Sequence, residues 1–548
     1  MRITAALLAG LALAPSLSHA QDRIAVPSGL ENLLPSDAFF VVRATSLDAL
    51  QDVLTEMTAD VAPEEEAPDL LDGLPMDVEL LVKDQPCALA ASMRNGQPVM
   101  TILVPTTDPE AAAASMPQPD GGAPSRIAGN YVGMTQGDSY ELGDGTFIQG
   151  MQPGILSMRL DLAPLVEAYG PFIDMGMEQA RMQLEQEADD MPAGFDLEVL
   201  MDVYFDGFEA LMESAQILDL GIDFQQGQLT FQTSLSLAEG STLAGFGSDT
   251  PSDLGSIAKR LNGTNTVGTV LTGIDYSLYD ETLTPLIHDF IGVYPEQIRA
   301  GMQSYMDDYI AILRNFTPNF GGEFRLRDGI QMAFVAQAKA NAADAMPAVR
   351  KMLSSTYFED LGIELGTIED QNIFGFEGVL SKLSMDMSKL AELIGAEAAT
   401  EDQDQIAAMG DEEVQEILRT IYGGDSMDFW VGTSDKYLVY TAGGNENVRA
   451  QAVNGVKAAS STHNAALNWA IDTVAHRSPS MVYQLDFGAI VHQSEALFQA
   501  MDEDWDEVPA GVPQSALTTA YYVVEDLNWH SGVRLDWKAL AQMIRTTD

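Results

Sequence analysis

The sequence predicts an α+β fold in which about five βαββα repeats follow one another, with antiparallel or mixed sheets and helices packed on one face. Two recurring patterns predict it. Five times, an apolar run ends at a Ser or Asp and continues as an amphipathic segment, and a pair of alternating apolar segments around a turn follows each time. The chain has 548 residues, more than one hydrophobic core usually organises, which agrees with an array.

The first pattern marks the start of each repeat. It appears first in "LPSDAFFVVRATSLDALQDVL", Leu34 to Leu54, where Ser46 follows the apolar run. It recurs at intervals of 100 to 115 residues at four aspartates, Asp161, Asp275, Asp386 and Asp486. Ser and Asp side chains accept an otherwise unpaired backbone N–H of the first helical turn, so we interpret these residues as helix N-caps rather than catalytic or calcium-binding groups.

The second pattern is a hairpin in each repeat. Asn-Gly and Asp-Gly, which tolerate the positive φ of a tight turn, lie between the alternating segments of two repeats. The other three repeats have Gln-Gly, Asp-Lys or a single Asn at this place. Each hairpin is followed by a helix-start pattern, of which "TDPEAAAASM" and "DWKALAQMI" are the first and last. The expected turns lie at Asn95-Gly96, Gln226-Gly227, Asp328-Gly329, Asp435-Lys436 and Asn528.

These patterns divide the chain into a signal peptide and five repeats. The second and third repeats carry long amphipathic helical insertions, which need a surface to cover. The predicted boundaries are 1–20 for the signal peptide, 21–154, 155–262, 263–371 and 372–475 for repeats one to four, and 476–548 for a shortened fifth repeat.

The first twenty residues, "MRITAALLAGLALAPSLSHA", combine Arg2, an apolar centre and a small-residue ending at Ala20. This pattern predicts a cleavable secretory signal, and hence a periplasmic or secreted protein. No Cys follows the cleavage position, which excludes the lipoprotein route. No later apolar run reaches the ~18 residues that a membrane span needs, so we do not expect the chain to span a membrane.

The charge balance is extreme, with 82 acidic and 27 basic residues and a formal net charge of −55. Such a field repels phosphate backbones and excludes nucleic acid as a partner. Three interpretations of the acidity stay open: a surface suited to saline surroundings, a cation-binding surface, and a docking face for a basic partner. The spread of the acids over most of the chain favours the first.

Three segments resemble a family of exported bacterial proteins of unknown function. They are "LPSDAFFVVRATSLDAL", "FWVGTSDKYLVYTAGGNENV" and "GQLTFQTSLSLAEGSTLAGF". The family is built around an N-terminal Leu-Pro-x-Asp-aromatic strand and helix. The resemblance covers most of the mature chain and implies a periplasmic or secreted α+β protein with no assigned activity. It carries over no functional residues.

Residues with chemical potential are few. "DEDWDE" places Asp502, Asp504 and Asp506 at the alternation of a calcium loop, but the glycine and glutamate of an EF-hand are missing, so a weak Ca²⁺ site is the alternative to a solvated acidic loop. His492 and Glu495 lie one helical turn apart without a second ligand pair. The single cysteine, Cys87, cannot form an intrachain disulfide, and we interpret it as a buried apolar residue; the chain contains no recognisable catalytic motif.

The helical insertions are the remaining candidate for a site. Their methionines and aromatic residues fill cores in most proteins, yet such flexible side chains also line grooves for apolar ligands. The candidate groove residues are Met175, Met177, Met182, Phe205 and Phe208. We therefore expect an exported, non-enzymatic interaction or scaffold protein. The alternatives are a carrier for a lipid or other apolar ligand and, third, a hydrolytic enzyme without a recognisable motif.

Overall fold

The structure of the protein is a computed structural model. It describes residues 30–547 except 31–32, 72–75, 95–96, 116–125, 136–140, 142, 144–145, 188–196, 242, 247–249, 264, 276–283, 295, 328, 358, 360–361, 386–418, 425, 476–478, 496–498, 500–507 and 526. The predicted signal peptide, Asp386 and the predicted calcium-loop residues Asp502, Asp504 and Asp506 lie outside the described residues.

The chain divides into two compact units, each assembled from segments that are distant in the sequence. The first unit comprises Met1–Ile173, Met212–Ala244 and Asp526–Asp548, and the second comprises Asp174–Leu211 and Gly245–Glu525. The divisions fall inside two long helices, α5 (Ala163–Glu187) and α6 (Leu197–Ser214).

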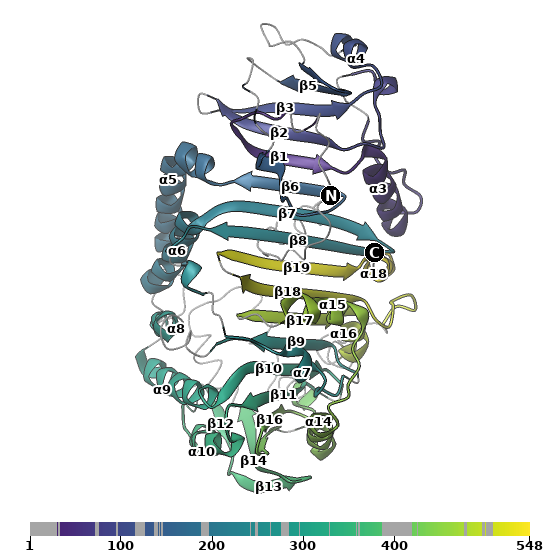
Figure 1. Cartoon of the computed structure of the whole chain (residues 1–548). Coiled ribbons are helices and arrows are strands. Elements are labelled where there is room, and N and C mark those ends of the chain that lie inside the picture. Colours follow the sequence, from purple (N-terminus) through teal and green to yellow (C-terminus); the bar gives the residue numbers. More distant parts are fainter. Residues whose placement is uncertain are drawn as a thin grey trace. The chain divides into compact units, whose positions relative to one another are not determined.

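The first unit contains an antiparallel sheet with the strand order β4-β5-β3-β2-β1-β6-β7-β8-β19 (Figure 1). The turn between β7 and β8 has positive φ at Gln226 and Gly227, as the hairpin pattern predicts. The strands are β1 (Ala38–Ala44), β2 (Cys87–Arg94), β3 (Gln97–Pro105), β4 (Arg126–Ala128), β5 (Tyr131–Thr135), β6 (Leu156–Asp161), β7 (Ala215–Gln225), β8 (Gln228–Leu237) and β19 (Asn528–Asp536).

Both faces of this sheet are buried near β3, because successive residues of a strand point to opposite faces. Leu103 belongs to a cluster with Tyr131 and Leu34, whereas Val104 packs with Ala112 of α4 (Pro109–Ser115). The helix α3 (Leu47–Val61) contacts the C-terminal helix α18 (Trp537–Thr547), which in turn contacts β8 and β19. Short 3-10 helices complete the unit at Val78–Leu80, Thr146–Ile148 and Leu243–Phe246.

The second unit contains an antiparallel sheet with the order β18-β17-β9-β10-β11-β16-β15-β14, and β12 and β13 both pair with β14 (Figure 1). The strands are β9 (Gly268–Gly273), β10 (Phe316–Arg325), β11 (Gln331–Ala338), β12 (Ile363–Leu365), β13 (Glu369–Ile373), β14 (Phe376–Met385), β15 (Met427–Thr433), β16 (Tyr437–Ala442), β17 (Ser480–Asp486) and β18 (Leu517–Glu525). The α+β class and the antiparallel pairing agree with the sequence prediction.

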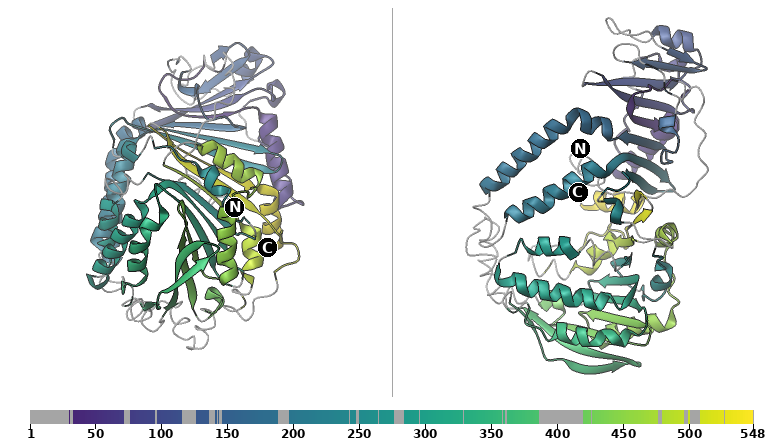
Figure 2. Two further views of the ribbon diagram at one scale, coloured as in Figure 1. Left: turned by 60° about the horizontal axis from the view of Figure 1, so that its bottom comes forward. Right: turned by 60° about the vertical axis from the view of Figure 1, so that its left-hand side comes forward.

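Helices cover both faces of the second sheet (Figure 2), so the expectation of helices on one face is wrong for this unit. A side chain at Gly321 would meet Ile257 of one helix, whereas the preceding residue, Phe320, packs against a cluster that includes Ile312 and Val349 of two others. Helices cover both faces because these strands carry apolar side chains on both of their faces. The helices of this unit, besides parts of α5 and α6, are α7 (Leu254–Ala258), α8 (Thr284–Ile291), α9 (Glu296–Leu313), α10 (Met346–Leu353), α14 (Glu446–Ala458), α15 (Ala465–Val474), α16 (Phe487–Gln493) and a 3-10 turn at Ala342–Ala345.

Two of the predicted N-caps, Ser46 and Asp486, cap the helices that follow them. Ser46 Oγ accepts a hydrogen bond from the Ala49 N–H at 3.0 Å, and Asp486 Oδ1 accepts one from Ala489 N–H at 3.0 Å. Asp161 lies one residue before the cap position of α5, and its Oδ1 accepts a hydrogen bond from the Ala163 N–H at 3.1 Å. Asp275 instead accepts a hydrogen bond from the Thr250 hydroxyl. Among the described residues, no helix has both the length and the apolar character to cross a bilayer.

Candidate functional site

The long insertion of the predicted second repeat forms the helix pair α5 and α6. Arg181 on α5 joins the two helices: its guanidinium lies 2.7 Å from a carboxylate oxygen of Asp202 and 5.3 Å from the ring centroid of Phe205, both on α6. Both members of the ion pair are exposed. An exposed ion pair stabilises a fold by little, so it adds little to the association of the two helices.

The sequence grouped five residues of these helices as a groove, and the structure separates them onto two sides. Met175 and Met182 point outward, with 53% and 48% of their surface exposed. Met177, Phe205 and Phe208 are half-buried. Sequence reasoning missed Tyr204, which is 69% exposed on α6. These three exposed apolar residues, Met175 and Met182 on α5 and Tyr204 on α6, are together called the helical surface below.

The helical surface lies in a strongly acidic setting. Between residues 163 and 214 the sequence contains thirteen acidic residues and a single basic one, Arg181. Tyr204 is flanked on its own helix by Asp202 and Asp206, which are both exposed. The surface therefore combines apolar side chains with concentrated negative charge.

Neighbouring helices of the second unit also expose aromatic rings. Phe290 on α8 and Tyr309 on α9 are exposed, and Tyr309 stacks on Tyr305 with the ring centroids 6.5 Å apart. The helix α9 is fixed by Asp308, whose carboxylate accepts hydrogen bonds from Lys351 Nζ at 2.8 Å and from the Tyr357 hydroxyl. Burial alone would raise the pKa of Asp308, but these two hydrogen bonds and the positive charge of Lys351 together outweigh burial and lower it.

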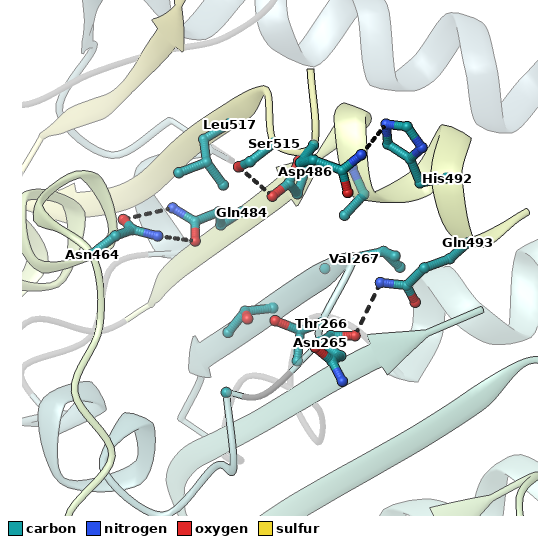
Figure 3. Close-up of a pocket in the computed structure, with 15 residues that line it drawn as sticks. Asn265, Thr266, Val267, Asn464, Gln484, Asp486, His492, Gln493, Ser515 and Leu517 are labelled. Carbon is teal, nitrogen blue, oxygen red and sulfur yellow. Dashed lines mark hydrogen bonds between the residues drawn. The ribbon is translucent and has the colours of Figure 1, made fainter. Parts of the chain in front are cut away.

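A separate candidate is a polar cavity of about 400 Å³ within the second unit (Figure 3). It lies beside the start of β9, the end of β17 and the helix α16. Its wall is rich in carboxamides, namely Asn265, Asn464, Gln484, Gln493 and Gln514.

Two of these carboxamides form a rigid frame. Asn464 Nδ2 donates to Gln484 Oε1 at 2.7 Å, and Gln484 Nε2 donates back to Asn464 Oδ1 at 3.1 Å (Figure 3). Gln484 Nε2 also donates to the buried Thr519 hydroxyl at 2.5 Å. Asn464 caps α15 by accepting the Leu467 N–H at 2.9 Å. The frame is thus tied to one helix and two strands.

Asp486 organises the opposite side of the cavity. Its Oδ1 accepts the backbone N–H groups of Ala489 and Ala516, and its Oδ2 accepts the Ser515 hydroxyl at 2.6 Å. With three donors this carboxylate is a structural cap, as the sequence predicts. His492 lies nearby, with Nε2 3.0 Å from the Gln514 amide nitrogen and 3.3 Å from the Val512 carbonyl oxygen.

The other residues singled out from the sequence have no metal-binding arrangement in the described part of the chain. His492 and Glu495 both line a second cavity of about 660 Å³, but the described residues include no group of three or more His, Cys, Asp or Glu side chains that could hold a metal ion. Burial raises the pKa of the Cys87 thiol to about 11, so the thiol is protonated at neutral pH and unsuited to nucleophilic chemistry.

Sequence reasoning did not find the cavity residues Gln484 and Thr269. Both occupy inward-facing positions of otherwise apolar strands, next to Val482 and Leu271 on the same face, and all four are buried. The sequence signal for these residues is a carboxamide or hydroxyl side chain at a strand position where the alternating pattern predicts an apolar residue.

No family model and no curated protein sequence matches the chain. One solved structure, described as "Structure of crystal form I of TP0453", is similar over 54% of this chain and 96% of that chain, with 8% sequence identity and a TM-score of 0.21. A likeness of this size carries no argument about fold or function.

Proposed function

We propose that the protein is an exported, non-enzymatic interaction protein whose helical surface binds a basic, amphipathic polypeptide segment. The observation that carries the proposal is the exposure of Met175, Met182 and Tyr204 on helices whose charged residues are almost all acidic. Large apolar side chains exposed on neighbouring helices are typical of interaction sites.

The apolar residues supply contact area without demanding one shape of partner. Methionine is unbranched and polarisable, so it adapts to the side chains that it meets. Tyrosine contributes a large rigid ring at a small cost in conformational entropy. An amphipathic helix of the partner, laid along α5 and α6, would bury these side chains under its own apolar stripe.

The charge selects the kind of partner. A second copy of this chain would bring acidic surface against acidic surface, and an anionic lipid surface would be repelled in the same way. Lys and Arg side chains beside an apolar stripe would instead meet complementary charge, which accelerates association and excludes wrong partners. The carrier alternative has less support, because four cavities of the described residues are lined by residues other than Met175, Met177, Met182, Phe205 and Phe208.

The proposal includes the repeat architecture and the export signal. Four of the predicted repeats each contribute three consecutive antiparallel strands: β1-β2-β3, β6-β7-β8, β9-β10-β11 and β14-β15-β16. In two places the first strands of two repeats pair with each other, β1 with β6 and β9 with β17. Both features support a scaffold built from about five βαββα repeats that carries helical insertions.

Fluorescence anisotropy with a synthetic peptide tests this function. The probe is a labelled helical peptide made of two Lys-Leu-Ala-Lys-Leu-Ala-Lys repeats. We expect saturable binding that weakens as ionic strength rises, because salt screens the attraction between the basic peptide and the acidic helices. Replacing Met175, Met182 and Tyr204 together by Ser should weaken binding by about ten-fold or more.

The controls separate this surface from general acidity. Tyr483→Ser removes another exposed aromatic residue of the second unit, on β17, and should leave affinity unchanged. A peptide of the same composition with its leucines spread around the helix should bind more weakly. Equal binding of the ordered and scrambled peptides, or undiminished binding by the triple variant, would contradict the proposal.

A further inference from the structure

A row of buried polar side chains crosses four strands of the second unit. Thr519 on β18 is directly opposite Gln484 on β17, which is opposite Thr269 on β9, which is opposite Glu323 on β10. All four are at least nine-tenths buried. Because polar groups are costly to bury, each member of such a row needs a hydrogen-bond partner, which is another protein group, an ordered water or a ligand.

Three members of the row have partners. Gln484 and Thr519 bond to each other, and Glu323 accepts hydrogen bonds from the Gly263 N–H at 2.8 Å and from Arg325 Nη2 at 2.5 Å. Thr269 differs from them. Its side chain is 9% exposed and lines the cavity, and its hydroxyl has no hydrogen-bond partner among the described residues. An unpaired hydroxyl at the wall of a cavity is a ready contact for a ligand.

The cavity wall offers donors and acceptors in fixed positions. Each amide nitrogen carries two hydrogens and each amide oxygen two lone pairs. Asn464 Nδ2 uses one hydrogen on Gln484, and Gln484 Oε1 uses one lone pair on Asn464, so one donor and one acceptor remain in the frame. The Thr266 hydroxyl adds a group that both donates and accepts, whereas the Ser515 hydroxyl, whose hydrogen is donated to Asp486, adds an acceptor.

The same wall is unsuited to other ligand classes. Its apolar residues, Val267, Ala489 and Leu517, are a minority of the lining, which disfavours a lipid. Asp486 is a carboxylate at the wall and would repel an anion, yet its three accepted hydrogen bonds leave it little capacity for a cation. The chemistry that remains is an uncharged molecule with many hydroxyls.

We infer that this cavity binds a neutral saccharide of one or two rings, held by the Asn464–Gln484 frame and the Thr269 hydroxyl. Neighbouring sugar hydroxyls donate and accept together, as the carboxamides and hydroxyls of the wall do. A volume of about 400 Å³ lies in the lower part of the range of small-molecule sites, which limits the ligand to this size.

Saturation-transfer NMR with glucose, galactose, N-acetylglucosamine and maltose tests the inference on the full chain. At up to about 10 mM sugar the experiment detects dissociation constants in the millimolar range. We expect transfer to at least one sugar. Thr269→Val keeps the shape of the side chain and removes the hydroxyl, so affinity should fall about five-fold or more.

Two further variants make the result decisive. Thr272→Val is the same change on the same strand but on the other face of the sheet, and should leave binding unchanged. Ala489→Phe places a ring at the cavity wall and should abolish binding while thermal unfolding shows a folded protein. Absence of transfer to all four sugars, or transfer that neither Thr269→Val nor Ala489→Phe reduces, would overturn the inference.

Discussion

The helix α14 and the helix α5 both belong to amphipathic regions, but they use their apolar residues differently. In α14, Val448, Ala452, Val453 and Val456 are buried, and the helix contacts β11 and β16. In α5, Met175 and Met182 are about half exposed. An apolar stripe therefore serves the fold where a sheet lies beneath it, and is free for a partner where it faces outward.

The difference extends to the neighbouring helices. α15 contacts β17 and β18 through a buried stripe that includes Leu467 and Ile471. α6 exposes Tyr204 between acidic residues. The lesson is that periodicity predicts a helix and its apolar side, whereas the object that covers this side is decided by the tertiary structure.

Truncation of an apolar residue should separate the two kinds of helix most strongly. Leu467→Ala on α15 removes buried methyl groups and leaves a cavity, and should lower the free energy of unfolding by about 2–5 kcal/mol. Met182→Ala on α5 should change it by less than about 0.5 kcal/mol, because about half of this residue is already exposed to solvent. Urea unfolding of both variants measures the contrast, and comparable losses would show that α5 is packed like α15.

The arginine ion pairs offer a second, smaller contrast. Arg449 on α14 is buried and lies 2.8 Å from an oxygen of the half-buried Asp428, whereas Arg181 and Asp202 are both exposed. Arg449→Met leaves a desolvated carboxylate without its partner and should lower the free energy of unfolding by about 2 kcal/mol. Arg181→Met should cost less than about 1 kcal/mol. Denaturant unfolding measures both losses. A larger loss of unfolding free energy for Arg181→Met than for Arg449→Met would contradict this expectation.

The Asp308 site should produce the smallest effect and a pH signature. The pKa of Asp308 is lower in the folded protein than its ordinary value, so its charged form stabilises the fold above the ordinary carboxyl pKa, and this stabilisation is lost as the pH falls through the folded value. Asp308→Asn should therefore lower Tm at pH 7, and the difference from the unchanged protein should shrink as the solution is acidified. A difference that stays constant with pH would show that the charge of Asp308 contributes nothing.

Local features of the fold could be predicted from the sequence because they depend on neighbouring residues. The caps at Ser46 and Asp486 and the positive-φ turn at Gln226 and Gly227 depend on side-chain and backbone chemistry within a few positions. The α+β class follows from the same local patterns. The division of the chain into two units does not follow from local patterns. It depends on the pairing of β19 with β8, which is nearly 300 residues away in the sequence, and neighbouring residues do not predict such a pairing.

The candidate sites were less accessible to sequence reasoning. Met175 and Met182 were selected by composition, but the separation of these two from Phe205 and Phe208 depends on which side of each helix is covered. The cavity depends on the pairing of Thr269 with Gln484, which lie more than 200 residues apart. Only their polar character at apolar positions of a strand was visible in the sequence.

Methionine-methyl NMR tests the central claim most directly. The protein, labelled with ¹³C in its methionine methyl groups, is titrated with the basic amphipathic peptide, and signals are assigned by single Met-to-Leu variants. The resonances of Met175 and Met182 should shift and broaden as the peptide binds, while the buried Met134 and Met427 keep their positions. Unchanged signals of Met175 and Met182 at saturating peptide would contradict a binding role for the helical surface.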